Sequence, residues 1–172
     1  RFELPCLPEG DFPQLTHGEL SHRFSLPAPV LKHLIETTRF AMSTEETRYH
    51  LNGIYFHTLE KEGIKVLRTA ATDMHRLACA EAACPEGAFG MPEIIVSRKT
   101  IQEIIKLLDE ADQPVHLGIS PNRIEFSIDG SKMQAVLSAR LIEGGFPDYM
   151  PALVINHEKT LIVPSESFAD AV

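Results

Sequence analysis

The sequence lacks an apolar stretch long enough to cross a membrane, and its first residues lack the pattern of a secretory leader. No run approaches the roughly 18 consecutive apolar residues of a membrane-spanning helix, and the amino end has no basic stretch followed by an apolar one. These absences predict a soluble, cytoplasmic protein. At 172 residues and 44% hydrophobic content, the chain can bury one good core with room for a partial second unit, which excludes a disordered tail.

Metal-binding and catalytic motifs are also missing. The three cysteines are an odd number without metal-ligand spacing, and we interpret them as reduced thiols. None of the eight histidines has a carboxylate or cysteine at a ligand spacing such as His-Glu-x-x-His. A nucleophile elbow, a phosphate-binding glycine loop and a dinucleotide fingerprint are absent as well. The sequence therefore predicts no metal site, no cofactor and no catalytic residue.

The net charge of -8 argues against a general basic surface for nucleic acid. Two segments predicted to be helical oppose that sign. One has Lys32 and Arg39 against Glu36, and the other has Arg98, Lys99 and Lys106 against Glu103. Two readings stay open, because these can be ordinary solvated helix faces or a local surface for phosphates. Any DNA contact must be confined to such a surface.

A repeated cassette organises the chain, in which a short apolar strand runs through a small residue into an amphipathic helix. Its copies are Phe24–Ile35 and Ile94–Ile105, which superpose without a gap. Apolar positions recur at the spacing that places one stripe against a core: Leu31, Leu34, Ile35 and Thr38 in the first helix, and Ile101, Ile104, Ile105 and Leu108 in the second. Pro27 or Pro29 and Ser97 stand where helices start. The pattern predicts two equivalent halves.

Strand-like segments separated by turn residues follow each helix. We predict strands at Tyr49–Leu59, Ile64–Thr72 and His75–Ala83 in the first half, and at Pro114–Ser120, Arg123–Ile128 and Lys132–Leu141 in the second. Each half thus has a strand, a helix and a three-strand meander. The predicted fold class is α+β, with two helices packed on one side of antiparallel sheets.

A third copy of the cassette begins at Leu161–Val172, and the chain stops inside its helix. A second marker repeats as well, since Glu9-Gly10-Asp11-Phe12-Pro13 resembles Glu143-Gly144-Gly145-Phe146-Pro147. The longer repeat, from one marker to the next, is therefore expected to correspond to one domain. We expect 1–18 to end one domain, 19–150 to form a complete one, and 151–172 to start another.

The segment Thr72–Leu77 holds residue types that can act as an acid–base pair. We favour a tight hairpin, in which Asp73 makes an Asx-type turn and His75 and Arg76 open the next strand. A small hydrolase or deaminase that uses His75 and Asp73 with a carboxylate stays open as an alternative. So does a general β-rich interaction module.

Four motifs carry a resemblance to a known family. Arg48–Gly53, Ala71–Ala78, Ile95–Lys99 and Glu143–Tyr149 resemble, in order, the bacterial sliding clamp, the beta subunit of DNA polymerase III. The resemblance implies a DNA-clamp fold and a non-enzymatic processivity factor, whose full-length form is a ring-shaped homodimer of three-domain chains around duplex DNA. It also implies that 19–150 is the middle clamp domain.

The resemblance further implies a hydrophobic pocket for short linear motifs of the DNA polymerase III alpha subunit, the clamp loader and repair polymerases. The matching positions are Leu51, Thr72, His75, Arg76, Leu77 and Pro147, and Met74 is also assigned to the pocket. Leucine and proline would supply apolar walls, and the polar residues would form a rim. The chain departs from the family at Met74, where glycine is usual, and at Met150-Pro151-Ala152.

The same resemblance assigns three residues to a DNA-facing surface, namely Arg48, Arg98 and Lys99. Contacts to phosphates would be independent of sequence and sensitive to salt. Glu45 stands where the family often has an uncharged polar residue, and this change weakens a DNA contact from that loop.

Overall fold

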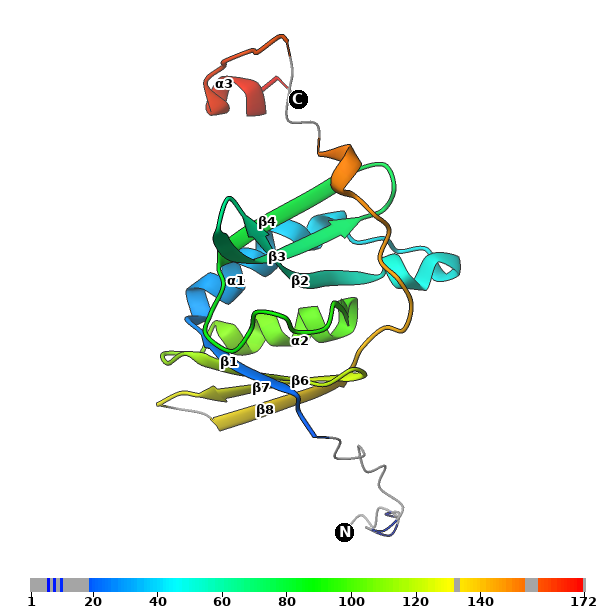
Figure 1. The fold of residues 1–172 in the computed structure, drawn as a ribbon, viewed down its shortest axis with the longest axis vertical. Helices are drawn as coiled ribbons and strands as arrows, with labels where there is room; N and C mark the ends of the chain where they lie inside the picture. Colours follow the sequence, from blue (N-terminus) through cyan, green and yellow to red (C-terminus); the bar gives the residue numbers. More distant parts are fainter. Residues whose placement is uncertain are drawn as a thin grey trace, which may run out of the picture.

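The structure, a computed structural model, describes residues 6, 8, 10, 19–131, 134–153 and 158–171. Two antiparallel sheets and two helices account for most of the regular structure (Figure 1). The first half contains β1 (His22–Leu26), α1 (Ala28–Thr38), β2 (Gly53–Lys61), β3 (Ile64–Thr72) and β4 (Leu77–Ala83). The second half contains β5 (Ile94–Ser97), α2 (Arg98–Leu108), β6 (Val115–Ile119), β7 (Arg123–Asp129) and β8 (Gln134–Arg140).

The two halves exchange their first strands. The strand orders are β1-β6-β7-β8 and β4-β3-β2-β5, so β1 joins the meander of the second half and β5 joins that of the first. Phe24 lies opposite Leu117, and Tyr55 lies opposite Ile95. The predicted α+β class with antiparallel sheets is confirmed. Because each sheet needs a strand from the other half, the halves form one body with a common core.

The apolar stripes of the repeated cassettes face the core, as their spacing predicts. Leu31, Leu34, Ile101 and Ile104 are fully buried, and burial of each such side chain contributes about 1.5–3 kcal/mol. Helix α1 packs against β3 and β4, while α2 contacts β2 and β5 of one sheet and β7 and β8 of the other. Ser97 caps α2, because its side-chain oxygen accepts a hydrogen bond of 3.3 Å from the amide of Thr100.

Two strands of the first half begin later than predicted. The first meander strand was expected from Tyr49, but residues Glu46–Leu51 form a 3-10 helix and β2 begins at Gly53. A side chain at Gly53 would place its Cβ 2.4 Å from the carbonyl oxygen of Val96. The close approach of β2 to β5 at this position therefore requires a glycine. The third strand begins at Leu77 rather than His75, because the turn before it is longer than expected.

The carboxyl-terminal cassette differs from the other two copies. Leu161, Ile162 and Val163 form no strand in the described part of the chain and are exposed, whereas a short helix, α3 (Ser165–Ala169), forms as expected. A strand needs a neighbouring edge for its backbone hydrogen bonds, and none of the described strands pairs with this segment. Most of the marker at 9–13 lies outside the described residues. Among the described helices, none is both long and apolar enough to span a membrane.

Candidate peptide pocket and helix surface

A cavity of about 230 Å³ lies between the β3–β4 hairpin and the chain segment that follows β8. Its lining residues are Thr72, Met74, His75, Arg76, Leu77, Pro147, Asp148, Tyr149 and Ala152. Six of the seven residues that the resemblance assigns to a pocket therefore meet at one cavity. Leu51 does not line it and is only 1% exposed, so its place in a peptide site stays a prediction. Asp148 and Tyr149 were not predicted, whereas Ala152 belongs to the segment Met150-Pro151-Ala152 in which the chain departs from the family.

The hairpin side of the cavity is built by two side chains that hold the backbone. Thr72 Oγ1 accepts a hydrogen bond of 3.0 Å from the amide of Met74 and donates one of 2.8 Å to the carbonyl of Arg76. Asp73 Oδ1 accepts hydrogen bonds of 3.0 Å from the amides of His75 and Arg76, which confirms the predicted Asx-type turn. These amide donors, that of Arg76 first, lower the pKa of the Asp73 carboxyl. The carboxylate is thus occupied as a structural acceptor.

Met74 adopts a backbone conformation that ordinarily favours glycine. Its φ is 75°, in the left-handed region, and its side chain is 60% exposed at the edge of the cavity. This conformation costs a residue with a Cβ about 1–2 kcal/mol. The glycine that the resemblance leads us to expect here would avoid this cost, and this chain instead places a flexible thioether at the cavity.

An exposed aromatic ring extends the rim of the cavity. The guanidinium carbon of Arg76 lies 5.8 Å from the ring centroid of Phe40, within the range of a cation–π contact. Arg76 Nε is also 2.9 Å from Asp73 Oδ2. Arg76 is thereby held from two sides while it lines the cavity.

The opposite wall, Pro147–Ala152, lies over the face of the β4-β3-β2-β5 sheet that points away from the helices, here called the outer face. Alternation along the strands places His57, Arg68 and Glu81 on this face, directly opposite one another on β2, β3 and β4. The next row on the same face is Tyr55, Ala70 and Cys79. Thr72 and Leu77 follow and line the cavity. The outer face therefore leads from a charged row, across a row with two small side chains, to the pocket.

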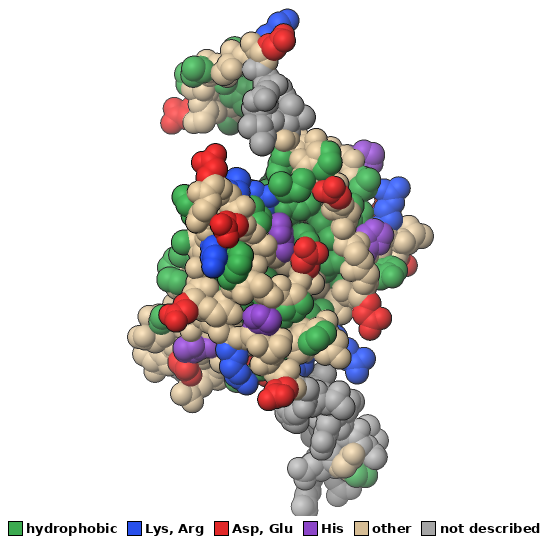
Figure 2. All heavy atoms as spheres, in the orientation of Figure 1, with side chains coloured by type: hydrophobic (Ala, Val, Ile, Leu, Met, Phe, Trp, Pro, Cys, Tyr) green, Lys and Arg blue, Asp and Glu red, His purple; other side chains and the backbone are tan. Residues whose placement is uncertain are grey.

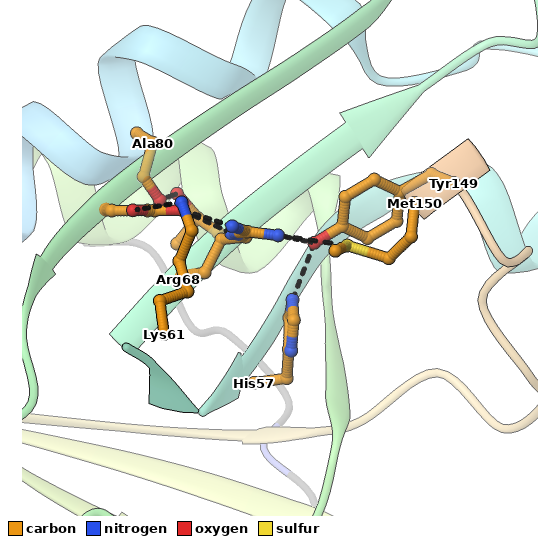
Figure 3. A network of polar contacts seen from close by, with 8 residues as sticks. His57, Lys61, Arg68, Ala80, Tyr149 and Met150 are labelled. Atoms are coloured by element: carbon orange, nitrogen blue, oxygen red, sulfur yellow. Dashed lines mark hydrogen bonds and ion pairs between the residues drawn. The ribbon is translucent and has the colours of Figure 1, made fainter. Parts of the chain in front are cut away.

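A polar network joins the charged row to the pocket wall (Figure 3). The Tyr149 hydroxyl lies 2.7 Å from His57 Nε2 and accepts a hydrogen bond of 3.3 Å from Arg68 Nη1. Arg68 Nε donates to Glu81 Oε1 at 2.7 Å, and Lys61 Nζ lies 3.2 Å from the same oxygen. Only 2% of Arg68 is exposed. A buried guanidinium must keep such partners, because an unpaired charge in this place would be strongly destabilising.

Aromatic stacking holds the same segment against the sheet. The rings of Phe146 and Tyr55 are parallel within 2°, with centroids 4.6 Å apart, and Tyr55 also stacks on His57 at 4.7 Å. Burial raises the pKa of Tyr55 and of Tyr149, whereas burial and then the nearby Arg68 charge lower the pKa of His57. His57 is consequently neutral near pH 7, where its ring can accept a hydrogen bond.

Sequence reasoning missed this network, although one signal was present. Arg68 is a charged residue inside the largely apolar strand Ile64–Thr72. A charge in that place needs partners, but the residue that supplies one of them, Tyr149, is 81 positions away. The pairing could be found only once the strands were in register.

The residues assigned to a DNA surface differ in how free they are. Arg98 donates from Nη2 to the carbonyl oxygens of Met42, at 3.0 Å, and Ser43. Arg48 Nε lies 3.4 Å from Glu45 Oε2. Lys99 is exposed and forms no ion pair within the described residues. Arg98 and Lys99 line an open groove of about 680 Å³ with seven other residues, namely Thr44, Tyr49, Asn52, Ser97, Gln102, Glu103 and Ile142.

Other positive charges on the two helices are balanced by neighbours. Lys32 Nζ lies 2.5 Å from Asp109 Oδ1, which links α1 to the end of α2, and Lys106 pairs with Glu103 at 3.0 Å. Acidic and basic side chains are interspersed on the face shown in Figure 2. No group of three or more metal-ligating side chains occurs among residues whose positions the structure describes.

Comparison with known proteins gives consistent matches. The family model for the central domain of the DNA polymerase III beta subunit matches residues 25–148. The beta sliding clamp of Caulobacter vibrioides strain NA1000 / CB15N is 46% identical over 172 residues, covering 100% of this chain and 45% of that protein. The beta sliding clamp of Escherichia coli strain K12 is 37% identical over 161 residues, covering 94% and 42%. The chain thus spans less than half the length of these relatives.

Solved structures agree in fold. The structure of Caulobacter crescentus pol III beta aligns with a TM-score of 0.91 and 46% identity, covering 99% of this chain and 45% of that one. The sliding clamp from Bartonella birtlesii bound to griselimycin aligns with a TM-score of 0.90 and 43% identity, with the same coverage. These matches, which agree with the motif order and with the fold, establish that the chain belongs to the bacterial sliding clamp family, where it corresponds to the central domain of the DNA polymerase III beta subunit.

Proposed function

We propose that this chain is the middle domain, at 19–150, of a sliding clamp that acts as a DNA polymerase processivity factor without bond chemistry of its own. In the complete protein, two chains form a ring around duplex DNA. The flanking segments 1–18 and 151–172 then belong to the neighbouring domains. Family membership supports this proposal, since the relatives over which the chain aligns are named beta sliding clamps.

The observation that carries the proposal is the cavity at the β3–β4 hairpin. It combines an apolar floor and wall from Leu77 and Pro147 with a polar rim from Thr72, His75 and Arg76. Such a site suits a short extended peptide, whose apolar side chains need a pocket and whose backbone needs polar partners. The partners are short linear motifs of the DNA polymerase III alpha subunit, the clamp loader and repair polymerases. The Bartonella birtlesii relative binds griselimycin, so a clamp of this fold takes a ligand.

Peptide affinity tests the pocket. A fluorescein-labelled peptide of the Gln-Leu-x-Leu-Phe type should bind this chain, more weakly than it binds the full-length clamp, because we expect part of the pocket to come from the third domain. Leu77→Lys should abolish binding, since a charge in an apolar pocket loses its hydration without gaining a partner. Leu59→Lys is the matched control, because Leu59 is a half-buried leucine in the same sheet away from the cavity.

The measurement is fluorescence anisotropy, with circular dichroism to show that both variants are folded. Binding by folded Leu77→Lys at wild-type affinity would contradict the pocket. Cleavage or deamination of a substrate that depends on His75 and Asp73 would instead favour the enzyme alternative. The hydrogen bonds that hold Asp73 as a turn acceptor argue against that alternative.

We further propose that the groove beside α2 faces DNA, with Lys99 as its most accessible cation and Arg98 as a contributor of positive potential. Pairing of Lys32, Arg48 and Lys106 with acidic neighbours keeps the surface weakly attractive. Weak contacts suit a ring that must slide, since phosphate contacts give affinity without sequence preference. In the full-length protein, Lys99→Glu should reduce processive extension by a polymerase, most at low salt. Lys159→Glu, an exposed site distant in sequence from α2, is the control. Equal processivity of the two variants would remove Lys99 from the DNA surface.

A further inference from the structure

The wall of the pocket is a segment without regular structure. Between the end of β8 and the 3-10 turn Met150–Ala152, residues 143–149 make no backbone hydrogen bond to either sheet in the described part of the chain. Side chains hold it instead, through the Phe146–Tyr55 stack and the Tyr149 hydroxyl. The position of Pro147 between these two anchors therefore depends on side-chain contacts that lie outside the cavity.

Tyr149 connects the anchor to the cavity. Tyr149 is 6% exposed and lines the cavity, while its hydroxyl contacts His57 and Arg68. His57 and Arg68 do not line the cavity themselves. Arg68 and Thr72 lie on the same face of β3, four residues apart, which corresponds to about 13 Å along a strand. The side-chain contacts that connect His57 to the pocket wall are those to Tyr149 and to the neighbouring aromatic stack.

The hydrogen-bond roles follow from chemistry. Arg68 can only donate, so the Tyr149 oxygen accepts from it. Among the described residues, His57 Nε2 is the acceptor within reach of the Tyr149 hydroxyl proton, so we assign the proton to this hydrogen bond. In this assignment Nε2 is the unprotonated nitrogen of a neutral ring. Met150 Sδ accepts a second contact from Arg68 Nη1 at 3.1 Å, so two consecutive wall residues depend on the same guanidinium.

We propose that His57 and Arg68 are positioning residues for peptide binding, and that they hold the wall Pro147–Ala152 in its binding geometry through the Tyr149 hydroxyl. This inference rests on the proposed peptide-binding function. It adds that affinity for the peptide is set partly by residues that never touch it. It also implies that protonation of His57 weakens binding, because the ring then loses its acceptor and places a second positive charge beside Arg68.

The groups that face His57 come from each element packed around it. Arg68 on β3 and Glu81 on β4 lie in register with it, Tyr149 comes from the wall, and Glu93 precedes β5. Burial and Arg68 lower the pKa of His57, whereas Glu93 and Glu81 act in the opposite direction. Since the net effect lowers this pKa below its ordinary value of 6.5, the neutral ring persists through neutral pH and is lost only on acidification.

A pair of substitutions at His57 tests the proposal. His57→Gln keeps a polar atom near the position of Nε2, and it should bind the Gln-Leu-x-Leu-Phe peptide within about twofold of wild type. His57→Met is similar in size but lacks a good acceptor, and it should weaken binding about fivefold to tenfold, the effect of one lost hydrogen bond. Anisotropy is measured at a temperature where circular dichroism shows all three proteins folded. A purely structural role would lower the melting temperature of His57→Met and leave the affinity of the folded protein unchanged.

The pH profile gives a second readout. Wild-type affinity should fall as the pH drops below about 6.5 through the pKa of His57, and His57→Gln should lose that component. The other cavity residues, including His75, are the same in both proteins, so the comparison isolates the change at position 57. Two results would overturn this inference and leave the proposed function standing, provided that the wild-type protein binds the peptide. One is equal affinity of His57→Met and wild type, and the other is superimposable pH profiles of His57→Gln and wild type. Failure of wild-type protein to bind the peptide would overturn both.

Discussion

Strands β3 and β7 hold equivalent places in the two halves, because each lies between the other two strands of its meander. In β3, six consecutive residues from Leu67 to Thr72 are buried, so both faces are covered. In β7, Ile124, Phe126 and Ile128 are buried, while Glu125 and Ser127 between them are half-exposed. One face of β7 is thus open to solvent, as in a typical two-layer antiparallel sheet.

The difference comes from the segment after β8. Tyr149 and its neighbours lie over β3, where Ala70 and Cys79 leave room for the rings and Arg68 supplies a polar partner. Across β7, the corresponding outer face includes the exposed His116, which lies 2.7 Å from Ser25 Oγ. The duplicated halves therefore build one scaffold, and the candidate pocket occurs where one half has gained a cover that the other lacks.

The largest expected effect is at the buried guanidinium. Arg68→Met should lower the free energy of unfolding by about 3 kcal/mol, because it breaks the buried ion pair with Glu81 and removes the donor to the Tyr149 hydroxyl. Arg140→Met on β8 removes an exposed arginine of the open sheet and should change stability by less than about 0.5 kcal/mol. Urea denaturation measures both. Equal losses of stability in the two variants would mean that an arginine on the covered face contributes no more than one on the open face.

A smaller loss is expected from the cover itself. Phe146→Ala removes the ring stacked on Tyr55 and should cost about 2 kcal/mol, less than a fully buried phenylalanine because this one is half-buried. Val136→Ala on β8 should have almost no effect, since Val136 is 67% exposed. Urea denaturation, with hydrogen exchange at the amides of β3, checks both variants. Unchanged exchange in Phe146→Ala would show that the segment does not protect the strand.

Stability should also depend on pH through the covered face. The pKa of His57 is lower in the folded protein than its ordinary value of 6.5, so the unfolded chain binds the proton more tightly. The stabilisation is therefore fully present above pH 6.5 and is lost as the pH falls through the folded-state pKa. In thermal denaturation, the melting temperature should decrease less between pH 7.5 and pH 5 for His57→Gln than for wild type. His116→Gln, on the open sheet, serves as the comparison. If its melting temperature depended on pH as weakly as that of His57→Gln, the pH dependence could not be assigned to His57.

The smallest effect concerns two turns of the covered sheet. Met74→Gly should raise stability by about 0.5–1 kcal/mol, because relief of the left-handed conformation exceeds the extra entropy of a glycine in the unfolded chain. Glu62→Gly, at a φ of 52° in the β2–β3 turn, should act in the same direction. Calorimetry measures both changes. A loss of stability confined to Met74→Gly would show that the methionine side chain contributes packing over the pocket.

Local patterns accounted for much of the fold. The apolar stripes of α1 and α2 and the Ser97 cap follow from short-range spacing, and all of them occur as predicted. The Asp73 turn was also predictable, because a short carboxylate reaches the amides of the next few residues. Prediction failed at Tyr49–Leu51, where apolar alternation resembled a strand but the chain forms a 3-10 helix before Gly53.

The sequence by itself determined the two cassettes, the α+β class, the family and most residues of the candidate pocket, because these depend on periodicity and on motifs a few residues long. Only the tertiary structure decided that β1 and β5 change places and that Tyr149 meets His57 and Arg68. Those contacts join residues that are 92 and 81 positions apart. No local preference encodes them, because strand register and the path of the covering segment are set by packing of the whole core.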